Sequence, residues 1–161
     1  METTSVLIVD DEPSMRMALA ESLLSCGYQV NTAVDGTDGL SKFQQGKYEV
    51  VVTDMRMPKA GGMDVLKGIK SMSPETHVIV ITAYGTVNTA VEAMKNGASD
   101  FIMKPFSLDE LERVVKNALA EDTKEMELHE SRQDESRLII TQDERMLSLL
   151  GMQGKFILHR K

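Results

Sequence analysis

Five short apolar runs recur along the first two thirds of the chain, and each ends at a polar residue or a turn. Such runs, rich in β-branched residues, are typical of strands, and a run that is apolar throughout is typical of a strand covered on both faces. The pattern predicts strands at residues 6–9, 29–33, 50–53, 77–81 and 99–103.

Apolar residues at helical spacing separate these runs. Pro13 suits the first turn of the first helix, and Gly27 ends it. Ser107 and Glu110 form a capping box that opens the last helix. The residues expected to face the core are Met15, Leu19, Leu23 and Cys26 in the first helix, Leu40 and Phe43 in the second, Val65, Leu66, Ile69 and Met72 in the third, Val87, Ala90, Val91 and Met94 in the fourth, and Leu108, Leu111, Val115, Ala118 and Leu119 in the fifth.

Strands and helices alternate five times, and the connections between them are short. This order predicts an α/β fold in which a parallel sheet carries helices on both faces through right-handed crossovers.

The character of the chain changes after Leu119. Residues 121–137 are mostly charged and polar, which predicts a helical linker; a weak coiled coil and a helix that frays into a linker both remain open. Residues 138–161 contain a strand-like run and a short apolar helical pattern but are too few to bury a core of their own. The basic stretch 153–161 departs from the pattern, and we interpret it as a possible non-native tail.

Composition narrows the functional classes. The net charge is -7 and the sequence pI is about 5.0, which argues against nucleic-acid binding by this segment. The single cysteine, Cys26, fits a reducing cytoplasm, and we expect it to be a buried structural thiol. No apolar run reaches the ~18 residues of a membrane span, and the N-terminus lacks signal-peptide features, so a cytoplasmic location is expected.

Charged and hydroxyl side chains stand at the ends of four predicted strands: Asp10 and Asp11, Asp54, Thr82 and Lys104. Parallel strands bring their carboxyl ends to one edge of a sheet, so these residues are expected to meet. Alone, each has an ordinary explanation as a helix cap, a turn residue or a surface lysine. A purely structural role does not readily explain why all of these residues stand at strand ends and together form a set of complementary charges.

Clustered carboxylates raise one another's pKa unless a cation neutralises them, and their hard oxygens suit Mg²⁺. With Lys104 and Thr82 nearby, such a site meets the needs of phosphoryl transfer, with Asp54 as the nucleophile.

The same residues carry a family resemblance. The segments 6–12, 52–58, 81–85 and 100–106 (VLIVDDE, VTDMRMP, ITAYG and DFIMKPF) resemble the receiver domain of bacterial two-component response regulators. The resemblance covers roughly residues 4–120 and implies a receiver domain at 1–120 with a flavodoxin-like fold and the strand order 2-1-3-4-5.

The resemblance also implies roles for individual residues. Asp54 would accept a phosphoryl group from a sensor histidine kinase. The implied Mg²⁺ site comprises Asp10, Asp11, Asp54 and the main-chain carbonyl of Arg56, and the implied phosphoryl contacts are Thr82, the amide of Ala83, and Lys104. Phe101 matches an aromatic switch position that responds to Thr82.

The amino-acid sequences of these motifs are similar to those of the NtrC-like activators of sigma-54 RNA polymerase. Residues 138–150 are similar to the start of the AAA+ ATPase domain of these activators. The chain stops at Lys161 without a phosphate loop or a helix-turn-helix, so it is expected neither to hydrolyse ATP nor to read DNA. The subfamily implies a homodimer through the fourth helix, the fifth strand, the fifth helix and the linker helix.

An α/β sheet of this kind is found in more than one class of protein, which gives three candidate functions. The first is a receiver switch that catalyses only its own phosphorylation and slow dephosphorylation. The second is a Mg²⁺-dependent aspartyl-phosphate phosphohydrolase, which usually carries a second Asp where this chain has Arg56. The third is a flavin electron carrier, whose phosphate would be repelled by the acidic run at 10–12.

Overall fold

The structure is a computed structural model of the chain, and it describes residues 3–83 and 85–122. The first compact unit runs from Met1 to Leu119. The helix that follows β5 is described over residues 108–122. The labelled elements are β1 (Ser5–Val9), α1 (Pro13–Ser25), β2 (Gln29–Ala33), α2 (Gly36–Gln45), β3 (Val50–Asp54), α3 (Gly62–Met72), β4 (His77–Thr82), α4 (Val87–Lys95) and β5 (Asp100–Met103).

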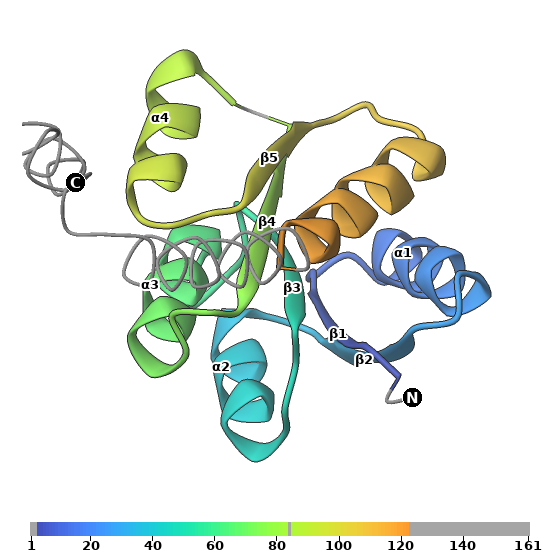
Figure 1. The fold of residues 1–161 in the computed structure, drawn as a ribbon. Helices are drawn as coiled ribbons and strands as arrows, with labels where there is room; N and C mark the ends of the chain where they lie inside the picture. The colour runs from blue at the N-terminus through green and yellow to red at the C-terminus, as the bar shows by residue number, and fades with distance from the viewer. Residues whose placement is uncertain (1–2, 84, 123–161) are drawn as a thin grey trace, which may run out of the picture. The chain divides into compact units, whose positions relative to one another are not determined.

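The five strands form one parallel sheet in the order β2-β1-β3-β4-β5 (Figure 1). This order and the alternation of strands and helices confirm the predicted doubly wound α/β fold. The direction in which successive strands are added to the sheet reverses between β1 and β3, and the carboxyl ends of both strands lie at the same edge of the sheet. In folds of this kind, ligands bind at that edge.

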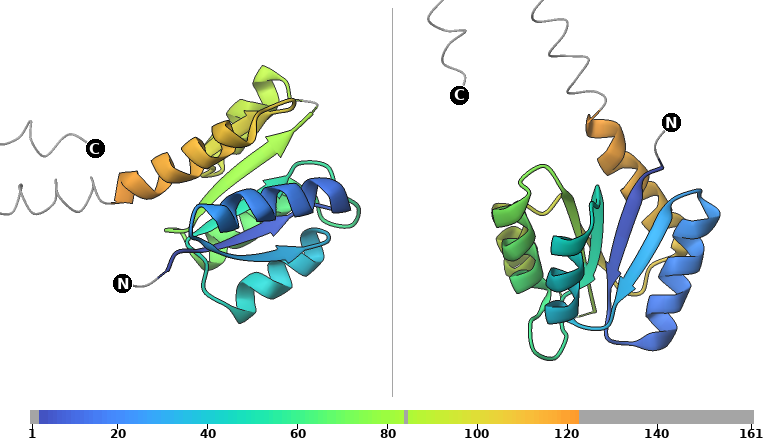
Figure 2. Two further views of the ribbon diagram at one scale, coloured as in Figure 1. Left: turned by 90° about the vertical axis from the view of Figure 1, so that its right-hand side faces the viewer. Right: turned by 90° about the horizontal axis from the view of Figure 1, so that it is seen from below.

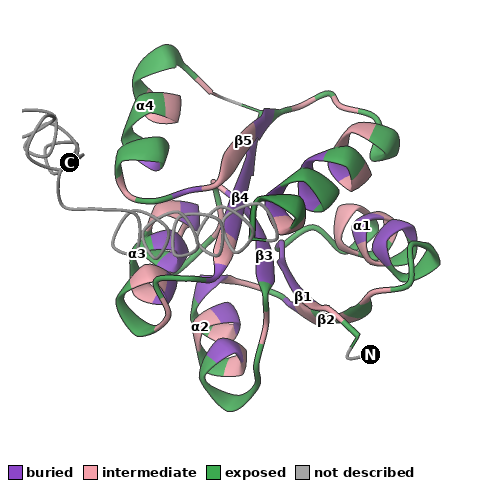
Figure 3. Ribbon diagram, in the orientation of Figure 1, coloured by how far each residue is buried: buried purple, intermediate pink, exposed green. Residues whose placement is uncertain are grey.

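Helices cover both faces of the sheet, with α1 and the helix at 108–122 on one face and α2, α3 and α4 on the other (Figure 2). Successive residues of a strand point to opposite faces. In β1, Val6 and Ile8 therefore join the core beneath α1, while Leu7 and Val9 join the core beneath α2 and α3. This two-sided burial, which extends along β3 and β4 (Figure 3), explains the unbroken apolar runs within the central strands.

Local signals place the helix ends. Asp35 accepts a hydrogen bond from the amide of Asp38 at 2.8 Å and caps α2. Ser107 Oγ accepts a hydrogen bond from the amide of Glu110 at 3.1 Å, which is one of the two bonds of the predicted capping box. These caps satisfy amides that have no partner within the helix.

Several burial predictions are wrong. Met72, the last residue of α3, and Leu108, the first residue of the helix at 108–122, are each 41% exposed, because they lie at helix ends that extend past the core.

The predictions for α4 and Cys26 are also wrong. In α4, Ala93 is the residue that packs into the core, while Val87, Val91 and Met94 are 79%, 44% and 48% exposed. The apolar stripe of α4 is therefore turned largely away from the sheet. Cys26 is also exposed, because it follows the last turn of α1 at the helix C-cap instead of lying within the buried stripe.

The predictions for 123–161, which cover most of the linker helix, the start of an ATPase domain and the possible non-native tail, lie outside the described residues. Within the described part of the chain, no helix is both long enough and apolar enough to cross a membrane.

Candidate functional site at the carboxyl edge of the sheet

The strand ends bring the predicted site residues to one edge of the sheet. Asp10 directly follows β1, Asp54 is the last residue of β3, Thr82 is the last residue of β4, and Lys104 directly follows β5. The parallel register pairs Val9 with Thr53, so the two acidic positions that follow lie side by side. Residues separated by up to 94 positions thus meet because the strands are parallel.

The three acidic side chains form one cluster. One carboxylate oxygen from each of Asp10, Asp11 and Asp54 lies within 4.8 Å of the other two. Asp10 and Asp54 are buried, at 2% and 9% exposure, while Asp11 is exposed. The Nζ atom of Lys104 lies 3.3 Å from Oδ1 of Asp54 and supplies a positive charge at the edge of the cluster.

Burial disfavours the charged form of these carboxylates. The pKa of Asp10 is raised from 3.8 to about 6, mainly by desolvation; the charges of Asp54 and Asp11 act in the same direction, and the Glu12 amide and Lys104 act against it. Desolvation also raises the pKa of Asp54, although Lys104 acts in the opposite direction. The cluster thus holds more negative charge than its surroundings neutralise.

The Asp10–Asp11 turn is held by two contacts from the start of α1. The amide of Glu12 donates to Oδ1 of Asp10 at 2.9 Å, and Nη1 of Arg16 donates to the carbonyl of Asp10 at 2.8 Å. Arg16 was not among the residues predicted from the sequence, although its position one turn after Glu12 allows this contact. The two bonds fix the carboxylate and the backbone of Asp10 within the cluster.

The chain turns sharply after Asp54. The amide of Met55 donates to the carbonyl of Ile81 at 2.8 Å, and the amide of Gly62 donates to the carbonyl of Met55 at 2.9 Å. A Cβ at Gly62 would lie 2.5 Å from the carbonyl oxygen of Asp54, so glycine is required for this close approach. Arg56 lies exposed in this turn.

The remaining predicted residues lie on the β4 and β5 side of the cluster. Thr82 is buried, and its carbonyl accepts a hydrogen bond from the amide of Lys104 at 2.9 Å. Ala83 follows it and is exposed. Phe101 is partly buried and packs against the core on the α2, α3 and α4 face. A Cβ at Gly85 would lie 3.0 Å from the Phe101 ring, so the ring touches the turn after Thr82.

The donor set suits a hard divalent cation. Three carboxylates within reach of one point supply oxygen ligands, and two of them, Asp10 and Asp54, carry a raised pKa that a bound cation would lower. On the chemistry of these side chains, the residues present fit a metal such as Mg²⁺.

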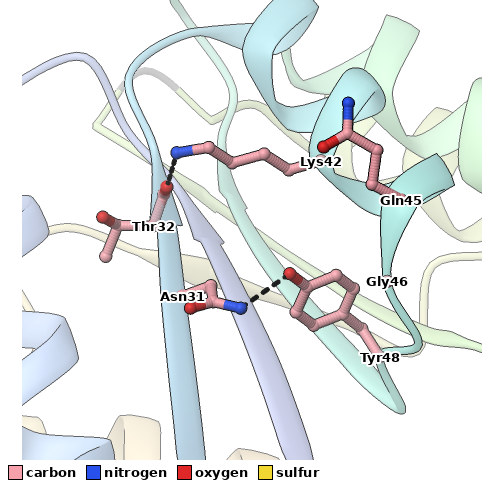
Figure 4. Close-up of a pocket in the computed structure, with 6 residues that line it drawn as sticks. All are labelled: Asn31, Thr32, Lys42, Gln45, Gly46 and Tyr48. Atoms are coloured by element: carbon pink, nitrogen blue, oxygen red, sulfur yellow. Dashed lines mark hydrogen bonds between the residues drawn. The ribbon is translucent and has the colours of Figure 1, made fainter.

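A pocket of about 470 Å³ lies elsewhere, beside β2 and α2 (Figure 4). Its polar groups are engaged with one another: Lys42 Nζ donates to the carbonyl of Thr32 at 2.6 Å, and Asn31 Nδ2 donates to the hydroxyl of Tyr48 at 2.8 Å. Its lining shares no residue with the acidic cluster.

Comparison with known proteins identifies the family. Residues 6–116 match the response regulator receiver domain. The chain belongs to this family. Proteins of this family are phosphorylated by histidine kinases and bind Mg²⁺ at an acidic pocket, which corresponds in position to the carboxylate cluster described above.

Relatives support the resemblance to NtrC-like activators. The chain is 42% identical over 114 residues to the regulatory protein AtoC of Escherichia coli, covering 71% of this chain and 25% of AtoC. It is 33% identical over 123 residues to the DNA-binding transcriptional regulator NtrC of Azospirillum brasilense, covering 76% of this chain and 26% of NtrC. The match thus spans about a quarter of each relative's length.

A solved structure shows the same fold. The response regulator receiver domain protein from Clostridium thermocellum superimposes with a TM-score of 0.71 at 35% identity, covering 74% of this chain and 97% of that one. The receiver domain therefore accounts for the part of the chain that contains the carboxylate cluster.

Proposed function

We propose that this receiver domain accepts a phosphoryl group on Asp54 from a phosphohistidine of a sensor histidine kinase. The observation that carries the proposal is the position of the Asp54 carboxylate. It ends a buried strand at the carboxyl edge of the sheet, 3.3 Å from the Lys104 ammonium and within the acidic cluster.

The proposed metal ligands are Asp10, Asp11, Asp54 and the main-chain carbonyl of Arg56, with Asp10 acting partly through water. Bound there, Mg²⁺ would neutralise the carboxylates and the developing charge on the phosphoryl oxygens. The raised pKa of Asp10 supports this role, because a buried carboxylate cluster lacks charge compensation without a cation.

In the proposed reaction, a carboxylate oxygen of Asp54 attacks the phosphorus atom. The phosphorus–nitrogen bond of the phosphohistidine breaks, and its electron pair leaves with the imidazole. Lys104 then pairs with a phosphoryl oxygen, and the Thr82 hydroxyl and the Ala83 amide donate hydrogen bonds to the others. The product is an acyl phosphate that water hydrolyses slowly, so the protein is a self-modifying switch and not a metabolic enzyme.

The switch is proposed to start at Thr82 and to reach Phe101. Thr82 is buried beside Asp54, and Phe101 packs against the turn that follows Thr82. Movement of the Thr82 hydroxyl toward a new phosphoryl group would open space for the Phe101 ring to turn inward. The new charge would thus bias a two-state element in the surface next to it.

That surface is apolar and exposed. We define the 4-5 face by Val87, Val91, Met94, Met103 and Leu108, each at least 41% exposed. A set of exposed large apolar residues marks a site of association. We propose that a second copy of the chain pairs through this face and through the helix from 108 onward, and that phosphorylation controls the pairing.

The output is proposed to be control of a downstream sigma-54-dependent ATPase domain in a cytoplasmic transcription regulator. The identity to NtrC and AtoC supports this proposal. The chain would transmit the signal without itself binding nucleic acid, in line with its net charge of -7.

Incubation with acetyl phosphate and Mg²⁺ tests the phosphoacceptor. The intact mass should increase by one phosphoryl group and return slowly to the starting value. Asp54→Asn should prevent the increase, whereas Asp109→Asn, a change at an exposed carboxylate on the helix at 108–122, should leave it unchanged. Rapid multiple turnover would instead support a phosphohydrolase, and phosphorylation of the Asp54→Asn variant would refute the assignment.

Sedimentation tests the switch. With Mg²⁺ and beryllofluoride, a mimic of the phosphoryl group, the oligomeric state should differ from that of the untreated protein. A monomer under both conditions would contradict the proposed pairing.

A further inference from the structure

The turn after Asp54 forms a closed loop, residues 55–62, whose base is fixed. Its first residue is tied to β4 by the bond from the Met55 amide to the Ile81 carbonyl, and the Gly62 amide closes the loop on the Met55 carbonyl. The amide of Gly61 donates to Oδ2 of Asp64 at 3.2 Å. These contacts fix the two ends of the loop but leave the position of its tip, around Lys59 and Ala60, to be set by other contacts.

The tip lies against the first residue of α2. A Cβ built at Gly36 would overlap the carbonyl oxygen of Ala60 and lie 2.7 Å from its carbonyl carbon. Real Cβ atoms do not approach backbone atoms this closely, and a backbone atom cannot move aside as the end of a side chain can. Gly36 therefore permits a backbone contact that every other residue would exclude.

A second contact joins the same two segments. Nζ of Lys59 lies 3.7 Å from Oδ2 of Asp35, whose side chain is 15% exposed. Lys59 has a φ of 70°, a conformation that residues other than glycine adopt only when their surroundings hold it. Asp35 also caps α2, so its carboxylate is already fixed in place by the Asp38 amide.

We propose that the Asp35–Gly36 turn is a positioning element for the metal side of the phosphorylation site. It seats the tip of the 55–62 loop and thereby sets the direction of the main-chain carbonyl of Arg56. Neither residue touches the reacting atoms, so both act through the loop. The inference rests on the proposed function, because it concerns the loop that the proposed metal site uses.

The expected sensitivity follows from the coordination preferences of the metal. Mg²⁺ demands near-ideal octahedral geometry at short ligand distances, so a small displacement of one carbonyl weakens binding. Groups that orient metal ligands from outside the first coordination sphere typically change metal affinity by about 10- to 100-fold when they are mutated. Displacement of the loop tip by one methyl group should have an effect of this order.

Gly36→Ala tests the proposal, and Gly27→Ala is the matched control. Gly27 has a φ of 95° and no atom within 4 Å of the added methyl group, and it follows α1 at the opposite end of β2 from the acidic cluster. Both variants should lower the melting temperature. Calorimetric titration with Mg²⁺ should show a dissociation constant raised about tenfold or more in Gly36→Ala and unchanged in Gly27→Ala.

Hydrogen exchange of the loop amides gives an independent readout. The amides of Ala60 and Gly61 should exchange faster in Gly36→Ala than in Gly27→Ala at equal global stability. Should Gly36→Ala fail to fold, Asp35→Asn serves instead, because asparagine keeps the cap but loses the charge that pairs with Lys59. That variant should weaken Mg²⁺ binding by about two- to threefold, as expected for an ion pair whose lysine side chain is 69% exposed.

The outcomes separate the two proposals. Wild-type protein that binds no Mg²⁺ overturns the proposed function together with this inference. Wild-type protein that binds Mg²⁺ while Gly36→Ala, or Asp35→Asn in its place, binds it equally well overturns this inference alone.

Discussion

At the amino ends of β4 and β5, the polar groups that the fold buries are paired with one another. The hydroxyl of Thr76 lies 2.8 Å from Ser73 Oγ and donates to the carbonyl of Tyr48 at 3.3 Å. Nδ1 of His77 lies 2.8 Å from Ser99 Oγ. Lys70 Nζ donates to the carbonyl of Thr76. Here hydroxyls, an imidazole nitrogen and the Lys70 ammonium are bonded to one another or to backbone carbonyls.

At the carboxyl ends of the strands, burial is combined with unbalanced charge. Three carboxylates converge, two of them buried, and Lys104 contacts one of them. Burial raises the pKa of Asp10 to about 6. The comparison shows two uses of buried polarity in one sheet: paired groups stabilise the fold, whereas an uncompensated cluster costs stability and creates a demand for a cation.

The largest expected difference between the two edges of the sheet is in metal binding, and a substitution of Asp10 tests it. Asp10→Asn removes one negative charge from the cluster but keeps an oxygen that can accept from the Glu12 amide. The dissociation constant for Mg²⁺ should rise by about 10- to 100-fold, measured by calorimetric titration. Equal affinity in wild type and variant would break the distinction between the two edges.

The same substitution should stabilise the metal-free protein at neutral pH. The pKa of Asp10 is raised in the folded state, so the folded state holds more protons than the unfolded state between pH 3.8 and about 6. The free energy of unfolding therefore falls as pH rises through this interval, by at most about 3 kcal/mol for this group.

Denaturant titrations with a chelator present measure this pH dependence. The wild type should lose stability between pH 4 and pH 7 relative to Asp10→Asn, and saturating Mg²⁺ should remove much of the difference at pH 7. A variant that is less stable than the wild type at pH 7 would contradict the account of an uncompensated cluster.

A substitution at the amino edge of the sheet should lower the stability of the protein and leave its Mg²⁺ affinity unchanged. Thr76→Val keeps the side-chain shape but removes the hydroxyl, which leaves the Tyr48 carbonyl and Ser73 without this partner. The free energy of unfolding should fall by about 1–3 kcal/mol, because a buried polar group loses its hydrogen bond. Mg²⁺ affinity should be unchanged, and a parallel loss of affinity would show that the two edges are coupled.

The smallest effect on stability is expected on the 4-5 face. Val91→Asp changes an exposed apolar residue of α4, so the free energy of unfolding of the isolated chain should change by less than about 0.5 kcal/mol. Self-association measured by sedimentation should nevertheless weaken. Lys95→Asp, a charge change on the same helix outside the apolar face, is the control. A large loss of monomer stability would mean that Val91 packs into the core.

The strands and the acidic cluster could be predicted because each follows from a strong local rule. Apolar runs mark the buried strands, and parallel pairing brings Asp10, Asp54, Thr82 and Lys104 to one edge wherever the loops go. The contacts of Arg16 and Gly36 could not be predicted, because they depend on where backbone atoms of distant loops lie. No periodic pattern records that information.

The error at α4 has a different cause. An amphipathic pattern shows that a helix has an apolar face but not which surface that face contacts. In α3 the apolar residues Val65, Leu66 and Ile69 are buried against the sheet. In α4 the small Ala93 makes the core contact, and the larger apolar residues are exposed to solvent. Cys26 was misplaced for a related reason, since the helix ends before the residue can be covered.

The central claim is that the carboxylate at the end of β3 is the Mg²⁺-dependent phosphoacceptor. Reduction of the acyl phosphate with borohydride after reaction with acetyl phosphate, followed by peptide mass spectrometry, locates the modified residue. The account predicts one modified residue, Asp54, and only when Mg²⁺ is present. Modification at another residue, or at Asp54 to the same extent in a chelator, would contradict it.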